Sequence, residues 1–282
     1  MKTGLVLEGG ALRGLYSAGI FDVLLENQIK FDGLIGVSAG AAFGCNYKSG
    51  QAGRVIRYSK RFAKDWRYCS LRSLFKTGDL FGGEFDYHYM PEKLDIFDIE
   101  SFEKNPMEYY AVCTDLETGE AVYKKLMKYS YEFCEWIRAS ASMPLVSRIV
   151  NINGQKLLDG GIADSIPLSY FQSLGYEKNI VVLTQPDGYQ KKPNSLMPLM
   201  KWQLRKYPNF LKAAANRHLM YNEQLKYVEE QEKAGNILVF RPKIKLPINH
   251  ITSDKNLMQE VYDLGKLQAE ERIDEVKKFL QI

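Results

Sequence analysis

The chain has 282 residues, of which 45% are hydrophobic and 26% charged, with a formal net charge of +4. This length can bury one sizeable core, and the ordinary Gly and Pro content excludes fibrous and disordered classes. The four cysteines form no CxxC pair and have no metal-ligand spacing, so we expect buried free thiols and no metal site. No apolar run approaches the roughly 20 residues of a membrane span, which makes a cytoplasmic protein the expectation.

The first 50 residues predict an alternation of strands and helices. Residues 4–7 form a short apolar strand, residues 8–14 a glycine-rich turn, and residues 15–27 a helix with apolar residues at helical spacing. A second strand over residues 33–37 leads into a small-residue helix over residues 39–47. Strand, turn and helix, repeated at this spacing, are typical of the start of a parallel α/β sheet.

The rest of the chain continues this pattern less regularly. Residues 51–65 are predicted to be helical, and residues 66–106 have no clear period. Further predicted elements are a hairpin over 107–126, a helix over 131–141, a hairpin of strands 148–152 and 155–159 around Asn153-Gly154, a strand over 180–184, a strand over 237–240, and a final helix from about Lys255. We predict a three-layer α/β/α sandwich around a mostly parallel sheet. It would form a single domain over residues 1–282, with a catalytic core in 1–185 and a mainly helical part in 186–282.

The motif with the clearest chemistry is Gly36-Val37-Ser38-Ala39-Gly40, a G-x-S-x-G between a predicted strand and a predicted helix. A nucleophilic serine must project from a tight strand-to-helix turn, and the glycines on either side relieve crowding there. The helix that begins behind the serine directs free amides toward a developing oxyanion. Ser38 is therefore the candidate nucleophile, with Gly36 and Gly40 shaping its turn. The alternative is a glycine-rich turn with an idle serine.

A second motif is the glycine-rich turn after the first strand. Its residues are Gly9, Gly10, Ala11, Leu12, Arg13 and Gly14. Backbone amides in such a loop can converge on an anion, and parallel strands present their C-terminal ends at one edge of a sheet. The amides of Gly10, Ala11 and Leu12 could thus form an oxyanion hole near Ser38, with Arg13 adding positive charge. A phosphate site or a plain tight turn would fit the same residues.

The third motif is Asp159-Gly160-Gly161 at the end of a predicted strand. The glycines let the backbone pass close to another group, and a carboxylate there can act as a base for a serine. No histidine in the sequence follows a predicted strand in a comparable way, which makes Asp159 the candidate base. The three histidines are His88, His218 and His250.

In this order and spacing, the three motifs resemble the patatin-like phospholipase family. The resemblance covers roughly residues 4–185 and includes the small-residue stretch 139–144 ahead of D-G-G; residues 237–242 are similar to bacterial cytosolic members. It implies Ser38 as nucleophile, Asp159 as its partner in a dyad with Gly160 and Gly161 in the proton-acceptor loop, and the glycine-rich turn as the oxyanion loop. Ala11 stands where the family commonly has a third glycine, and its Cβ disfavours a positive φ.

The resemblance further implies hydrolysis of lipid acyl esters, such as phospholipids or lysophospholipids, through an acyl-enzyme and without a cofactor. Two alternatives are a Ser-Asp-His esterase that uses His218 or His250, and a non-catalytic protein of the same fold. A third is a nucleotide-binding module built on residues 9–14 with Asp32. Asp32 precedes the strand over residues 33–37, which would leave it at the wrong edge of the sheet for a ribose.

Basic residues are concentrated in two segments. Residues 46–72 hold eight Lys or Arg against one Asp, and residues 186–220 hold seven against one. The second segment interleaves its charges with Trp, Met and Leu, as in a helix that lies on an anionic membrane, although an amphipathic helix packed on the sheet would look the same. We expect a lipid or ester substrate and no nucleic-acid partner. Transient peripheral contact with an anionic membrane is a hypothesis, and the oligomeric state is left open.

Overall fold

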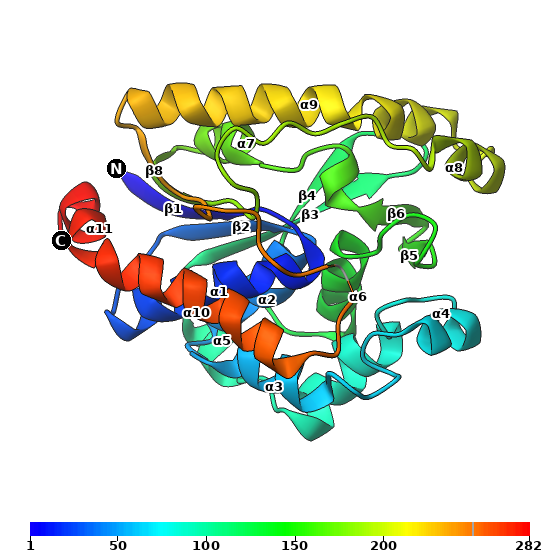
Figure 1. Cartoon of the computed structure of the whole chain (residues 1–282), viewed down its shortest axis with the longest axis horizontal. Helices are drawn as coiled ribbons and strands as arrows, with labels where there is room; N and C mark the ends of the chain where they lie inside the picture. Colours follow the sequence, from blue (N-terminus) through cyan, green and yellow to red (C-terminus); the bar gives the residue numbers. More distant parts are fainter. Residues whose placement is uncertain (250) are drawn as a thin grey trace.

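An eight-stranded sheet runs through the middle of the molecule and separates two layers of helices (Figure 1). The computed structural model describes residues 1–249 and 251–282. The strand order is β5-β6-β3-β2-β1-β7-β8, with β4 also paired to β3, and the five strands from β3 to β8 in this order run parallel. The strands are β1 (Lys2–Leu7), β2 (Gly33–Val37), β3 (Glu108–Asp115), β4 (Ala121–Lys125), β5 (Val150–Ile152), β6 (Gln155–Asp159), β7 (Tyr176–Val182) and β8 (Ile237–Phe240). The predicted α/β sandwich with a mostly parallel sheet is confirmed.

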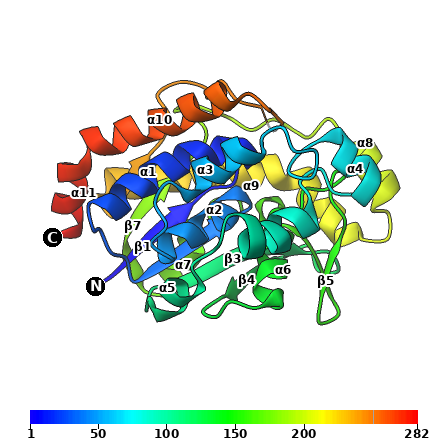
Figure 2. The ribbon, with the colours of Figure 1, turned by 90° about the horizontal axis from the view of Figure 1, so that it is seen from below.

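Helices cover both faces of this sheet. The layer drawn below the sheet in Figure 1 contains α1 (Gly14–Glu26), α2 (Ala39–Lys48), α3 (Arg54–Phe62), α5 (Ile99–Lys104), α6 (Tyr131–Ser140) and α10 (Lys255–Glu271). The opposite layer contains α7 (Leu168–Ser173) and the long α9 (Pro208–Lys233). Figure 2 shows α4 (Leu71–Thr77) and α8 (Met197–Gln203) at one end of the molecule, and α11 (Ile273–Leu280) with both termini at the other.

The sequence of β1 explains why both faces must be covered. Leu5 and Leu7 are fully buried in the larger core on the α1 side, and Val6 is fully buried in the core on the α9 side. A strand that is apolar at consecutive positions cannot leave either face exposed to water, which is typical of parallel sheets between helical layers.

The pairing of β3 positions the end of β6 beside the end of β2. A strand has two edges; β2 and β4 both pair with residues 110–112 of β3, so they lie on opposite edges. β4 and β6 both pair with residues 113–114, which places β6 on the edge that β2 occupies. Val37 pairs with Val112 and Asp159 with Cys113, so β6 continues along β3 where β2 stops. Asp159 therefore lies directly beyond the last residue of β2.

The aperiodic segment 66–106 is more ordered than the sequence predicts. It contains the short helices α4 and α5 and a π-helical segment, η2 (Phe85–Leu94), which includes Pro91. Six or seven residues are too few to produce a recognisable period, and a π-helix does not follow the 3.6-residue repeat. The short α7 was also not predicted, and β7 begins four residues before the predicted strand over 180–184.

Part of the first basic segment, residues 46–72, is buried, although its charge predicts an exposed surface. Lys48 is buried and donates to the carbonyl oxygens of Asn105 and Met107. Arg54 is also buried and forms an ion pair with Asp95 at 3.1 Å. These charges stabilise internal contacts and cannot reach a membrane. Within the described residues, no helix has both the length and the apolar character needed to cross a bilayer.

Candidate active site

Ser38 occupies a strained turn between β2 and α2. Its φ of 56° and ψ of −121° are unusual for a non-glycine residue, as expected of a serine raised on a strand-to-helix turn. The glycines on either side permit this turn by close approach. A Cβ on Gly36 would lie 2.5 Å from the carbonyl carbon of Gly40, and a Cβ on Gly40 would collide with the carbonyl oxygen of Leu7. The predicted strand, turn and helix around Ser38 are therefore present, and the role of Ser38 as nucleophile stays a prediction.

Two serines of the small-residue stretch 139–144 hold the ends of β2 and β6 in place. The backbone N–H of Ser38 donates to Oγ of Ser140 at 2.9 Å, and that hydroxyl donates to the carbonyl oxygen of Val112 at 2.6 Å. The backbone N–H of Asp159 donates to the carbonyl oxygen of Ser142 at 2.8 Å. In the sequence, this stretch is recognisable only through the family resemblance. Because Ser140 accepts the N–H of Ser38, that amide is not free to bind an oxyanion.

Asp159 is buried and lines the same pocket as Ser38. The backbone N–H of Gly161 donates to Oδ1 of Asp159 at 2.8 Å, and Gly160 passes so close to the carbonyl oxygen of Val112 that a Cβ would not fit. Burial raises the pKa of Asp159 above its ordinary value, while the charge of Arg217, the Ser38 hydroxyl and the Gly161 amide lower it. The result is a carboxyl whose proton affinity exceeds that of an exposed aspartate, which favours its use as a base.

The glycine-rich loop lies against the candidate nucleophile. A Cβ on Gly9 would lie 2.9 Å from Cβ of Ser38, so only glycine allows this approach. Ala11 has a positive φ of 48°, the conformation that its Cβ disfavours. Within the described residues, the N–H groups of Gly10 and Ala11 donate to no protein acceptor. The alanine therefore adopts the glycine-like backbone that the resemblance implies, at a cost in strain.

The six predicted loop residues divide between the pocket and the core. Gly9, Gly10, Ala11 and Arg13 line the pocket that contains Ser38. Leu12 is buried in the hydrophobic core, and Gly14 begins α1, where a Cβ would lie 3.0 Å from Cβ of Ala39. These last two residues pack against the interior of the protein.

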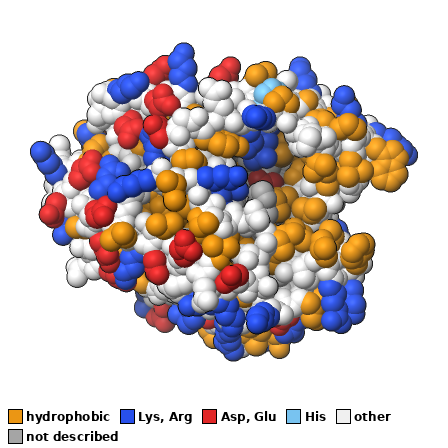
Figure 3. Space-filling view, viewed as in Figure 1, with side chains coloured by type: hydrophobic (Ala, Val, Ile, Leu, Met, Phe, Trp, Pro, Cys, Tyr) orange, Lys and Arg blue, Asp and Glu red, His pale blue; other side chains and the backbone are white. Residues whose placement is uncertain are grey.

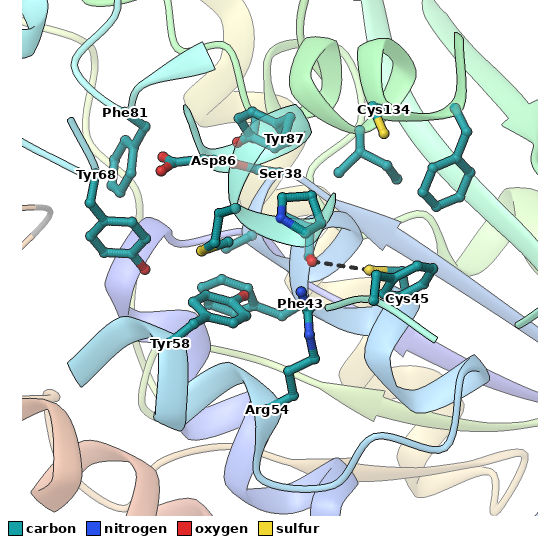
Figure 4. A pocket seen from close by; sticks show the side chains of 18 of the residues that line it. Ser38, Phe43, Cys45, Arg54, Tyr58, Tyr68, Phe81, Asp86, Tyr87 and Cys134 are labelled. Atoms are coloured by element: carbon teal, nitrogen blue, oxygen red, sulfur yellow. Dashed lines mark hydrogen bonds between the residues drawn. The ribbon is translucent and has the colours of Figure 1, made fainter. Parts of the chain in front are cut away.

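Ser38 lies where two cavities of different character meet. A pocket of about 480 Å³ opens on one side; we call it the polar pocket because the charged side chains of Asp159, Lys191 and Arg217 line it, together with apolar ones such as Leu145 and Leu196. On the other side an apolar cavity of about 100 Å³ extends between α2, α3, η2 and α6 (Figure 4). Its wall is mainly aromatic and aliphatic and includes Phe43, Tyr58, Phe81, Met90, Phe133 and Ile137. Burial raises the pKa of Asp86 on this wall well above its ordinary value, which favours an uncharged carboxyl. The cavity is thus suited to a hydrocarbon chain attached to a group at Ser38.

Lys191 and Arg217, from the second basic segment, reach the polar pocket. The sequence did not predict which basic residues of this segment would do so. Lys191 lines it, and burial together with Arg217 lowers the pKa of Lys191 to about 8. Arg217, on α9, donates through Nε to the carbonyl oxygen of Gly161. Glu8 is buried at the end of β1, where it accepts from the hydroxyl of Tyr221 at 2.6 Å. For Lys191 and Arg217, the sequence showed only that they belong to a segment rich in basic residues.

Two polar residues that rival readings could use, Asp32 and His88, do not line the pocket of Ser38. Asp32 accepts the N–H of Thr3 just before β2 begins, whereas Ser38 follows the last residue of β2, so the two lie at opposite ends of this strand. His88 is buried against Glu135; burial lowers its pKa, but hydrogen bonds with Cys134 and Glu135 raise it to about 9.

Neither His88 nor His218 is among the described residues that line the Ser38 pocket. His250, the other candidate base, lies outside the described residues.

Comparison with known proteins bears on the whole chain. The model of the patatin-like phospholipase family matches residues 5–171, and that of a domain of unknown function (DUF6363) matches residues 207–281. The lysophospholipase NTE1 of Candida glabrata is 27% identical over 93% of this chain and 15% of that protein, and its counterpart in Kluyveromyces lactis is 29% identical over 93% and 18%. The chain thus spans less than a fifth of these two relatives.

Two further similarities extend over most of both proteins. The uncharacterized protein YjjU of Escherichia coli is 26% identical over 94% of this chain and 75% of that protein. The crystal structure of VipD from Legionella pneumophila aligns with a TM-score of 0.48 at 12% identity, over 97% of this chain and 67% of that one. The model of the patatin-like phospholipase family covers more than half of the sequence, and the chain therefore belongs to this family.

Proposed function

We propose that this protein is a serine acyl hydrolase that cleaves lipid acyl esters, phospholipids or lysophospholipids, with Ser38 and Asp159 as a catalytic dyad. The observation that carries the proposal is the position of Ser38. It is raised on a strained turn, in the same pocket as the buried carboxyl of Asp159, where a polar pocket and an apolar cavity meet. The family membership and the lysophospholipase names of relatives support the same substrate class.

The proposed reaction proceeds through an acyl-enzyme. Asp159 accepts the hydroxyl proton as Oγ of Ser38 attacks the acyl carbonyl carbon, and a tetrahedral oxyanion forms. The unpaired amides of Gly10 and Ala11 would donate to this oxyanion. Collapse breaks the bond to the alcohol, which leaves with the proton from Asp159. Water then attacks the acyl carbonyl carbon of the acyl-enzyme and gives a proton to Asp159. Collapse of this second tetrahedral intermediate breaks the bond to Oγ of Ser38, which takes the proton back from Asp159, and the free acid leaves.

In this proposal the two parts of the substrate lie in different cavities. The hydrocarbon chain would enter the apolar cavity, because burying each methylene group there is worth about 0.8 kcal/mol. The alcohol part of the ester would remain in the polar pocket with Lys191 and Arg217.

Contact with a lipid surface is part of the proposal. Large apolar side chains are exposed on α4 and α8, at the same end of the molecule, beside the hollow that Figure 3 shows. Phe75 is 87% exposed and Trp202 69% exposed, and Leu196 lines the polar pocket while 54% exposed. Lys201 and Arg72 on the same helices would favour an anionic surface. This end could deliver the Ser38 pocket to a membrane without crossing it.

A fluorophosphonate probe tests the proposed nucleophile. It should label the wild-type protein at Ser38 and should not label Ser38→Ala, which should also lose hydrolysis of a lysophospholipid while remaining folded. Asp159→Asn should be nearly as damaging, because an amide cannot accept the proton. Labelling of another serine would refute the assignment.

Single His→Gln replacements separate the dyad from a triad. In a dyad each variant keeps most of its activity, whereas a folded but inactive His250→Gln would establish a triad in its place.

A further inference from the structure

A second hollow of about 420 Å³ adjoins the pocket of Ser38, between the loop that follows β7 and helix α9. It shares Lys191 and Arg217 with that pocket, and Lys192 and His218 complete its basic lining. Figure 3 shows Lys and Arg side chains gathered around a hollow under the right half of α9. Two of these basic groups thus face both the reacting site and the adjoining hollow.

These cations are not neutralised by ion pairs. Among the described residues, no ion pair involves Lys191, Lys192 or Arg217. Two nearby carboxyls act on these cations without a direct ion pair: Asp159 interacts electrostatically with Arg217 and Lys191, and Glu8 with Lys191. Both carboxyls also have hydrogen-bond partners of their own. Glu8 accepts from the amide of Thr184 and the hydroxyl of Tyr221, and Asp159 interacts with Ser38 and the Gly161 amide.

The backbone holds Lys191 in a fixed position. Its N–H donates to Oδ1 of Asn222 at 2.8 Å, and its carbonyl oxygen accepts from Nδ2 of the same side chain at 3.1 Å. Its ammonium group lies 4.5 Å from the ring centroid of Tyr221. Arg217 is anchored by its hydrogen bond to Gly161. A partly buried cation fixed in this way is expected to favour an anionic ligand, because burial without a direct ion-pair partner costs free energy.

We propose that Lys191, Lys192 and Arg217 bind the phosphate of a phospholipid or lysophospholipid headgroup while the acyl ester lies at Ser38. The proposal rests on the proposed hydrolase function and narrows its substrate class. An ammonium and a guanidinium are the groups that proteins commonly use for phosphate, and each would donate charge-assisted hydrogen bonds. A neutral glyceride with the same acyl chain would leave these cations without a partner.

The test compares two substrates that differ only in the phosphocholine headgroup. Wild-type protein should hydrolyse a lysophosphatidylcholine about 10- to 100-fold more efficiently, in kcat/KM, than the monoacylglycerol with the same chain, both as monomers below their critical micelle concentration. Lys191→Met and Arg217→Met should reduce this preference about tenfold or more. Lys212→Met is the matched control, an exposed lysine of α9 that does not line either pocket, and should keep it. An equal loss on both substrates would refute the subsite and indicate a structural role.

Binding measurements separate this proposal from the hydrolase itself. Titration calorimetry on Ser38→Ala should give tighter binding of an alkylphosphocholine than of an alkylglycerol ether with the same chain, and Lys191→Met should remove the difference. Inorganic phosphate should compete weakly if the headgroup is the ligand; phosphate that binds as tightly as the lipid would reassign the hollow to the free anion. If neither lipid substrate is hydrolysed but the binding preference persists, the hydrolase proposal fails and the phosphate site remains. Equal binding of both lipids would overturn the site.

Discussion

Replacement of Gly9 by alanine would test how closely the glycine-rich loop must approach the nucleophile. The new Cβ would lie 2.9 Å from Cβ of Ser38 and 2.9 Å from the carbonyl oxygen of Val37. Since carbon atoms pack best at roughly 3.5–4.0 Å, the loop or the serine must move by roughly 0.6–1.1 Å. Ser38 already has a φ of 56° and has little freedom to adjust. A displacement of about 1 Å in a reacting group can lower a rate about 10²-fold, so we expect kcat/KM to fall by about 10- to 100-fold.

The assay is hydrolysis of a soluble ester, with fluorophosphonate labelling rate and thermal unfolding measured on the same samples. Gly44→Ala is the matched control. Its Cβ would lie 2.9 Å from Cδ1 of Leu7 and 3.0 Å from a methyl carbon of Leu34, which are flexible side-chain ends in the core. We expect this control to change the unfolding temperature but to keep activity within roughly threefold, as for substitutions away from a site. Full activity of Gly9→Ala, or equal losses in the two variants, would refute the reasoning.

Three other predictions concern pH, loop strain and lipid contact. Because the pKa of Asp159 is raised and the base must be ionised, kcat/KM should fall as the pH drops through a value above that of an ordinary aspartate. Arg217→Met removes a charge that lowers this pKa, so the acid limb should move to higher pH; an unchanged limb would exclude Asp159 as the titrating group. Ala11→Gly should raise the free energy of unfolding in urea by up to about 1 kcal/mol with activity retained, since relief of about 1–2 kcal/mol of strain exceeds the glycine entropy cost, and a loss of activity would mean that the methyl group is required. Phe75→Ser combined with Trp202→Ser should weaken co-sedimentation with anionic vesicles, and high salt should weaken it further; equal binding to zwitterionic vesicles would contradict the charge argument.

Much of the candidate site was predictable because its motifs are local. Ser38 with its two glycines is specified within five residues, since a strand, a tight turn and a helix need no distant partner to be recognised. Asp159 follows from a hairpin with an Asn-Gly turn. The division of the chain at residue 185 stays a prediction.

Other parts of the site could not be predicted from the sequence, because their function depends on partners far along the chain. Ser140 contacts the amide of Ser38 from 102 positions away, and nothing in a run of small residues specifies that partner. The apolar cavity takes seven of its 21 lining residues from the segment 66–106, where a π-helix and two very short helices hide the period. Lys191 and Arg217 were visible only as members of a basic stretch.

The sequence by itself determined that a serine would be raised on a turn at the end of a buried parallel strand, and that a carboxylate would end a hairpin. The tertiary structure decided that these two ends meet. β4 occupies one edge of β3, which leaves β6 only the edge where β2 stops, so Asp159 follows directly after Val37. It also decided which charges are available: Lys48 and Arg54 are buried in internal contacts, whereas Lys191 and Arg217 reach the pocket. Local patterns determine the conformation of a segment, but the choice of neighbours depends on how whole elements share edges and bury surface.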